Sequence, residues 1–194
     1  MPDDVKLEKR DTERHELLFG VRRSVRYHSH RRRFFDSLGK FIKIFTVIGG
    51  VGTITTLLGR APAIWTLVYA AAAGLFSTID LVIGCAGSAK LHSDLAREFI
   101  QLERQMTKAG ANLSDEQLGD FVCRRLEIEE KEPTILRVLD LVCHNELCRA
   151  MGYERCAEVK LSWGQRFFAQ FFDVGLSKIE MERGLKEGVP SCKI

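Results

Sequence analysis

Two long runs of apolar residues, Ile44 to Gly59 and Ala61 to Ile79, lie almost back to back in the first half of the chain. Arg60 is the single charge between them. Each run approaches the roughly 17–25 residues that an α-helix needs to cross a hydrocarbon core. The stretch Gly59-Arg60-Ala61-Pro62 is rich in residues that favour a turn. The pattern therefore predicts a transmembrane hairpin of two antiparallel helices within residues 41–88.

Apolar positions elsewhere recur at helical spacing. We expect a loose start at residues 1–10, then a basic amphipathic juxtamembrane helix up to residue 40. After the hairpin, positions 91–106 predict a helix that continues out of the membrane and stops near Gly110. Ser114 and Gln117 form a capping box for the next helix, and Pro133 suits an early position of another that ends at Gly152. Residues 89–184 are thus a cytoplasmic helical region, followed by a tail at 185–194.

No segment alternates with the period of a strand, so the fold class expected is an all-α membrane protein. An aromatic stripe runs from Trp163 through Phe172 to Leu176. It fits packing against the preceding helices, and it also fits a helix that lies in the membrane interface.

Charge is distributed unevenly along the chain. The first 40 residues hold 11 Lys/Arg and 7 Asp/Glu, whereas residues 88–194 hold 16 and 18, within a net charge of +3. The positive-inside rule then places both termini in the cytoplasm. A cleaved signal peptide is not expected, because the apolar stretch begins too late. The arginines predicted to contact lipid headgroups are Arg22, Arg23, Arg26, Arg31, Arg32 and Arg33. Without a base-reading motif, no nucleic-acid partner is expected.

Both predicted spans carry a small or polar face. These faces either pack helices together or line a pore once several hairpins assemble. Their members are Lys43, Thr46, Gly50, Thr53 and Thr56 in the first span, and Thr66, Ala70, Ala73, Ser77 and Asp80 in the second. Because a carboxylate in a span is costly without a partner, Asp80 either pairs with Lys43 or sits in the interface with a local hydrogen bond.

Catalytic signatures are missing from the sequence. The run from Gly49 to Thr53 lacks the Lys-Ser/Thr of a phosphate-binding loop. We therefore expect a non-enzymatic protein without a cofactor, and an enzyme acting through Asp94, Glu98 or His144 remains an alternative. His28 and His30 are expected to be solvated. The six cysteines are expected to be free thiols in a reducing compartment, with a zinc site at Cys143, His144, Cys148 and Cys156 as the alternative.

Several motifs resemble the SLATT family, the two-transmembrane effector domains associated with SMODS nucleotidyltransferases and SLOG proteins. These motifs are Tyr27-His28-Ser29, Arg31 to Asp36, Asp80-Leu81-Val82, Leu91 to Arg97 with Phe99-Ile100, Glu132-Pro133 and Leu139 to Leu147. The resemblance spans residues 15–175. It implies a bacterial inner-membrane effector of antiphage defence that is activated by a partner and damages the membrane through pores.

The leading hypothesis is accordingly a homo-oligomeric pore-forming effector in contact with membrane lipid. A sensor or nucleotidyltransferase encoded nearby would trigger it. The alternative is a membrane-anchored adaptor whose cytoplasmic helices bind a partner protein without forming a pore. A third possibility is a soluble bundle that buries the two apolar runs as its core.

Overall fold

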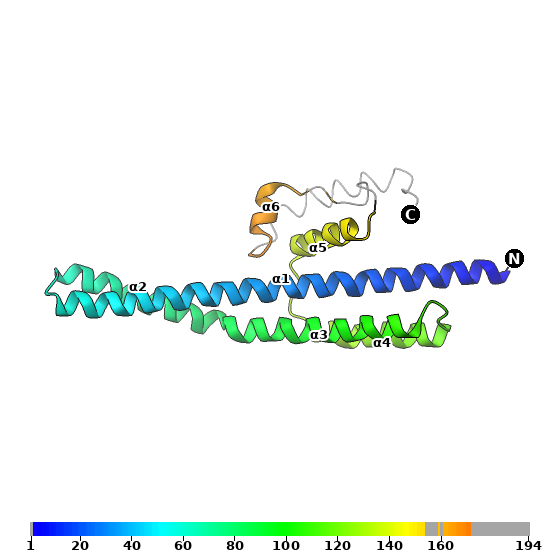
Figure 1. The fold of residues 1–194 in the computed structure, drawn as a ribbon, viewed down its shortest axis with the longest axis horizontal. Helices are drawn as coiled ribbons and strands as arrows, with labels where there is room; N and C mark the ends of the chain where they lie inside the picture. Colours follow the sequence, from blue (N-terminus) through cyan, green and yellow to red (C-terminus); the bar gives the residue numbers. More distant parts are fainter. Residues whose placement is uncertain (1, 154–158, 160, 172–194) are drawn as a thin grey trace. The chain divides into compact units, whose positions relative to one another are not determined.

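The computed structural model describes residues 2–153, 159 and 161–171 of the 194-residue chain, and every regular element in that part is an α-helix (Figure 1). The helices are α1 (Pro2–Leu58), α2 (Ala63–Ile83), α3 (Cys85–Ala109), α4 (Asp115–Glu129), α5 (Arg137–Ala150) and α6 (Trp163–Phe168). The all-helical prediction is confirmed for these residues. The predicted tail, together with Cys156 and Cys192, lies outside them.

The chain divides into two compact units. One comprises Met1–Ser29 with Asp94–Ile194, and the other comprises His30–Ser93. Helices α1 and α3 therefore contribute residues to both units.

Helix α1 is continuous from Pro2, so the prediction of a loose start at residues 1–10 is wrong. The same helix runs without interruption through the predicted juxtamembrane helix into the first apolar run. Pro2 occupies the first helical turn, where its missing N–H costs no hydrogen bond. The next proline along the chain is Pro62, so no imino acid breaks the hydrogen-bond ladder between them.

Glycine and proline end the apolar helices. Residues 59–62 separate α1 from α2, and Arg60 has a left-handed backbone with a φ of 53°. Gly84 also adopts the left-handed conformation, with a φ of 61°, and its N–H donates to the carbonyl oxygen of Asp80 at 2.8 Å. Helix α3 begins at the next residue. The predicted helix at positions 91–106 is therefore part of α3, and only the left-handed Gly84 separates α3 from α2.

In the unit formed by Met1–Ser29 and Asp94–Ile194, a hydrophobic core joins α1, α3 and α4. Its buried members include Leu17 and Val21 on α1, and Phe99 and Leu102 on α3. The predicted capping box of α4 is confirmed: the Gln117 N–H donates to the Ser114 hydroxyl at 3.2 Å, and the Ser114 N–H donates to the Gln117 side chain at 3.0 Å.

A second core cluster of the same unit is built around α5. Helix α5 begins at Arg137, so Pro133 is not an early helical position as predicted. Instead, the Leu136 N–H at the start of α5 donates to the Tyr27 hydroxyl at 3.0 Å. The buried Asn145 amide donates to the Val159 carbonyl oxygen at 2.6 Å and accepts from the Val159 N–H at 2.8 Å. Both backbone groups of Val159 are therefore satisfied by one side chain.

Three described aromatic side chains of the stripe lie outside the core. Trp163, Phe168 and Phe171 are 81%, 47% and 49% exposed, and the buried residue of this segment is Ala169. Packing of the stripe is therefore wrong for these three aromatic side chains. The part of the stripe from Phe172 onward lies outside the described residues.

Candidate membrane-spanning helix pair

The unit formed by His30–Ser93 exposes large apolar side chains along both of its long helices. Helix α2 contains no buried residue. The exposed side chains include Phe41, Ile44, Val47, Ile48, Val51, Ile54, Leu57, Leu58, Ile64, Trp65, Leu67, Val68, Leu75, Leu81 and Val82. Both helices are long and apolar enough to cross a membrane. This exposure argues against the soluble-bundle alternative, because a soluble domain buries such a surface.

Two glycines of α1 make the contact with α2. A Cβ atom at position 49 would lie 2.9 Å from the Ala73 Cβ and 2.9 Å from the Tyr69 carbonyl oxygen. A Cβ atom at position 52 would lie 2.6 Å from the Tyr69 ring. The two backbones therefore approach closely because Gly49 and Gly52 lack side chains, as is common for helices packed in lipid. Figure 1 shows α2 running back beside the end of α1.

Aromatic and hydroxyl contacts complete this interface. The rings of Phe45 and Phe76 stack with centroids 5.0 Å apart. The Thr66 hydroxyl donates to the Thr56 hydroxyl at 2.9 Å, and Thr56 donates to the Gly52 carbonyl oxygen at 2.8 Å. Hydroxyl groups thus link the two helices near the turn without leaving a donor unpaired.

The predicted polar faces divide between the interface and the surface. Thr56, Thr66 and Ala73 contact the neighbouring helix. Thr46 and Thr53 donate to carbonyl oxygens of their own helix, at Ile42 and Gly49. Gly50 faces open space, and Ala70 and Ser77 are exposed. A pore-lining role for these residues remains a prediction.

Sequence reasoning missed Gly49, Gly52 and Tyr69. The signal available was the glycine-rich stretch from Gly49 to Gly52, of which only Gly50 lies on the predicted polar face. The face of α1 that packs against α2 depends on the residues of α2. In α2, the contacting residues Tyr69, Ala73 and Phe76 recur at spacings of four and three.

A small pocket lies at the end of this helix pair opposite the turn. It has a volume of about 150 Å³ and is lined by Phe35, Asp36, Gly39, Lys40, Lys43, Asp80, Cys85 and Ala86. Lys43 and Asp80 therefore share one cavity. Among the described residues, however, no ion pair within 4.0 Å joins them. The thiol of Cys85 lies beside the Asp80 carboxylate, which agrees with the alternative of a local contact for Asp80.

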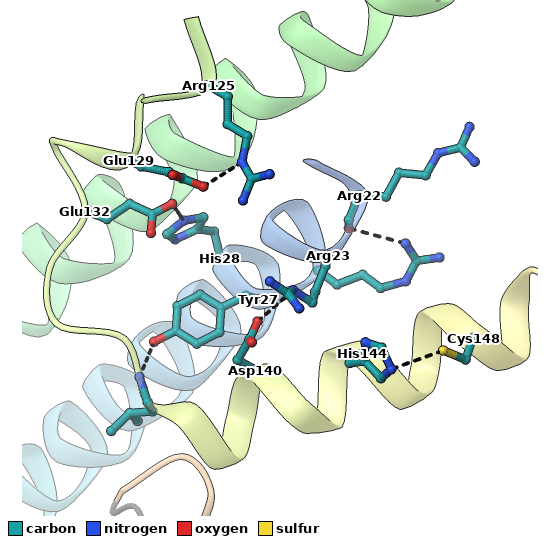
Figure 2. A network of polar contacts seen from close by, with 12 residues as sticks. Arg22, Arg23, Tyr27, His28, Arg125, Glu129, Glu132, Asp140, His144 and Cys148 are labelled. Atoms are coloured by element: carbon teal, nitrogen blue, oxygen red, sulfur yellow. Dashed lines mark hydrogen bonds and ion pairs between the residues drawn. The ribbon is translucent and has the colours of Figure 1, made fainter. Parts of the chain in front are cut away.

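Two of the predicted headgroup-binding arginines have protein partners within their own unit, the one formed by Met1–Ser29 and Asp94–Ile194. Arg22 pairs with Glu103 at 2.7 Å. Arg23 pairs with Asp140 at 3.1 Å (Figure 2). Each of these side chains is about one third exposed or less. The Arg26 guanidinium donates to the Arg22 carbonyl oxygen at 3.4 Å. The pairs give Arg22 and Arg23 a role inside the protein.

The three arginines nearest the apolar run have different surroundings. The Arg31 guanidinium lies over the rings of Phe34 and Phe35, 5.4 Å and 4.6 Å from their centroids. Arg32 forms an exposed pair with Asp36 at 3.6 Å, and Arg33 is exposed. The prediction of headgroup contact is most consistent with these three positions.

His28 is buried, so the prediction that it is solvated is wrong. Its side chain is 1% exposed, and Nε2 lies 2.9 Å from Oε1 of Glu132 (Figure 2). The ring stacks on Phe99 with centroids 5.6 Å apart. A polar ring can be buried here because Glu132, distant in sequence, meets its nitrogen.

The cysteine and histidine group shows no metal geometry in the described part of the chain. No cluster of three ligand side chains occurs there, although the Cys148 sulfur lies 3.5 Å from Nε2 of His144. Burial, followed by the nearby Glu146 and Asp140 carboxylates, raises the pKa of Cys143 to about 12. The fourth zinc candidate, Cys156, lies outside the described residues. None of the described cysteines, at 85, 123, 143 and 148, forms a disulfide bond.

Compared with known proteins, the chain matches no protein-family model, no curated protein and no solved structure.

Proposed function

We propose that this protein is a non-enzymatic, two-pass effector of the bacterial inner membrane, similar in function to the SLATT family. The exposed apolar surface of α1 and α2 carries the proposal, because α2 has no buried residue and both helices expose many large apolar side chains. The motifs that resemble the SLATT family and the basic residues before the first apolar run support this placement. Both termini would then lie in the cytoplasm.

Activity would require self-association of several helix pairs. Ala70, Gly74 and Ser77 share one face of α2 and are exposed. A Cβ atom at Gly74 would meet nothing within 4 Å, so this face is free for close contact with another copy. We propose that assembly through this face, triggered by a partner sensor or nucleotidyltransferase, opens a polar passage in the membrane.

Ion flux through liposomes tests the proposal. The purified full chain is reconstituted, insertion is checked by resistance to alkaline carbonate, and dye-reported flux is measured. Gly74→Leu should block close assembly and reduce flux at least about tenfold, which is the effect expected from losing roughly 1.4 kcal/mol of association energy. Val68→Leu is the matched control, since Val68 is 48% exposed on another face.

Two results would contradict the proposal separately. Release of the wild-type chain by carbonate would show that it is not an integral membrane protein. Tight liposomes despite confirmed insertion would reject the pore and leave only the membrane anchor.

A groove between α1 and α4 favours a second function, that of a membrane-anchored adaptor. It has a volume of about 440 Å³, and its lining includes the exposed Val122 and Leu126. Glu13, Glu16 and Glu129 add acidic groups, and Glu129 is paired with Arg125 at 2.6 Å. An apolar floor with an acidic rim is complementary to a basic amphipathic helix.

A model basic amphipathic peptide tests the adaptor. The full chain in detergent should bind the labelled peptide, and Leu126→Glu should weaken the binding about tenfold or more. Ile100→Glu serves as the control, because Ile100 is 49% exposed on α3 outside the groove. Equal binding by both variants would reject the groove as the docking surface.

A further inference from the structure

The pocket at Lys43 and Asp80 has the features of a ligand site as well as those of a packing defect. Its lining residues come from α1 and from the junction of α2 with α3, all within the unit His30–Ser93. Gly39 allows the two segments to approach, because a Cβ atom there would lie 3.2 Å from the Cβ of the buried Cys85. The left-handed Gly84 turns the chain between Asp80 and Cys85. The backbone therefore builds the cavity.

Charges of both signs line this cavity. Lys40 and Lys43 contribute ammonium groups, and Asp36 and Asp80 contribute carboxylates. In the part of the chain that the structure describes, neither lysine forms an ion pair within 4.0 Å. Asp36 forms an exposed pair with Arg32 at 3.6 Å. At the end of a membrane span, charges without protein partners are expected to meet polar groups of the lipid or water.

The combination of charges selects the class of ligand. A purely anionic group would be attracted by the two lysines but repelled by Asp80. A purely cationic group would be attracted by Asp36 and Asp80 but repelled by the lysines. A zwitterion that carries a phosphate and a primary ammonium satisfies both, since lysine binds phosphate and a carboxylate accepts from ammonium N–H groups.

We propose that this pocket binds the phosphoethanolamine headgroup of a membrane phospholipid. The inference rests on the proposed membrane placement, which puts the pocket at headgroup level below Arg31, Arg32 and Arg33. Lys43 would hold the phosphate, and Asp80 would accept from the ammonium group. Choline lipids share the phosphate, but their quaternary ammonium has no N–H to donate, so they should bind more weakly.

Native mass spectrometry of the full chain ejected from nanodiscs tests the proposal. The nanodiscs contain phosphatidylcholine with equal fractions of phosphatidylethanolamine and phosphatidylglycerol. The wild-type chain should retain the ethanolamine lipid preferentially. Lys43→Gln and Asp80→Asn should each reduce this retention about tenfold, whereas Lys43→Arg should keep most of it. Lys90→Gln is the control, because Lys90 is exposed on α3 outside the pocket.

The outcomes are distinguishable from failure of the membrane proposal. Integral insertion with no preference among the three lipids would overturn the pocket assignment and leave the two-pass placement intact. Equal loss of retention in Lys90→Gln would show nonspecific surface attraction and overturn it as well. Displacement of the lipid by water-soluble glycerophosphoethanolamine would support recognition through the headgroup.

Discussion

Neighbouring glycines in α1 provide a direct test of the helix-pair interface. Gly49→Ala would place a Cβ atom 2.9 Å from both the Ala73 Cβ and the Tyr69 carbonyl oxygen. Backbone atoms cannot move aside cheaply, so overpacking should cost about 1–3 kcal/mol. Replacing glycine by alanine in a helix returns up to about 1 kcal/mol. Gly50→Ala receives only this gain, because its Cβ would meet nothing within 4 Å.

The pair of variants should therefore differ by about 1–3 kcal/mol, or roughly 5- to 150-fold in the equilibrium between associated and separated helices. Cys85 offers a native reporter, since it is 2% exposed and lies against Gly39. In mild detergent titrated with dodecyl sulfate, alkylation of Cys85 would be followed by peptide mass spectrometry.

Gly49→Ala should expose Cys85 at a lower dodecyl sulfate fraction than the wild type, and Gly50→Ala should not. Equal midpoints for the two alanine variants would refute the assigned interface. A higher midpoint for Gly49→Ala than for Gly50→Ala would refute it as well, because helix propensity affects both positions alike.

Three further predictions concern other parts of the molecule. Glu132→Ala should lower the free energy of unfolding by about 1–3 kcal/mol, and Tm with it, because His28 loses a buried partner. A Tm equal to that of the exposed-site control Glu130→Ala would contradict this. The native Cys143 thiol keeps its proton up to a pH of about 12, whereas the unfolded thiol ionises from 9.0. The unfolding free energy should therefore fall as pH rises between these values. If Cys143 of the native protein were alkylated at pH 9.0 as fast as in urea, this prediction would be contradicted. Arg60→Gly should stabilise the associated helices by about 1 kcal/mol relative to Arg60→Ala, since only glycine relieves the left-handed backbone. The dodecyl sulfate midpoint of Cys85 alkylation should rise accordingly, and identical midpoints for the two variants would reject that strain.

Local chemistry was sufficient to predict several helix boundaries. The capping box of Ser114 with Gln117 acts within one turn, so the sequence alone predicts the start of α4. Gly110 has a φ of 82° and follows the end of α3, as expected for a left-handed residue after a helix. Residues 59–62 combine glycine and proline, and they separate α1 from α2.

Features that depend on distant residues could not be read in this way. His28 is buried because Glu132 meets it from 104 positions away, and one polar residue in an arginine-rich helix gives no sign of that partner. Arg22 likewise pairs with Glu103, 81 positions away. Gly49 and Gly50 are equally small, and only the position of Tyr69 and Ala73 decides which of them α2 contacts.

The bond pair between Asn145 and Val159 sets a boundary for shortened versions of the protein. Deleting the chain after α5 would remove Val159 and leave the Asn145 amide, which is 5% exposed, without its two backbone partners. An unsatisfied buried amide costs about 1–3 kcal/mol, so such a fragment would fold less stably although every long helix is retained. A fragment that keeps α5 therefore needs an end point beyond Leu161, because Val159 and Leu161 pack against the core cluster around α5.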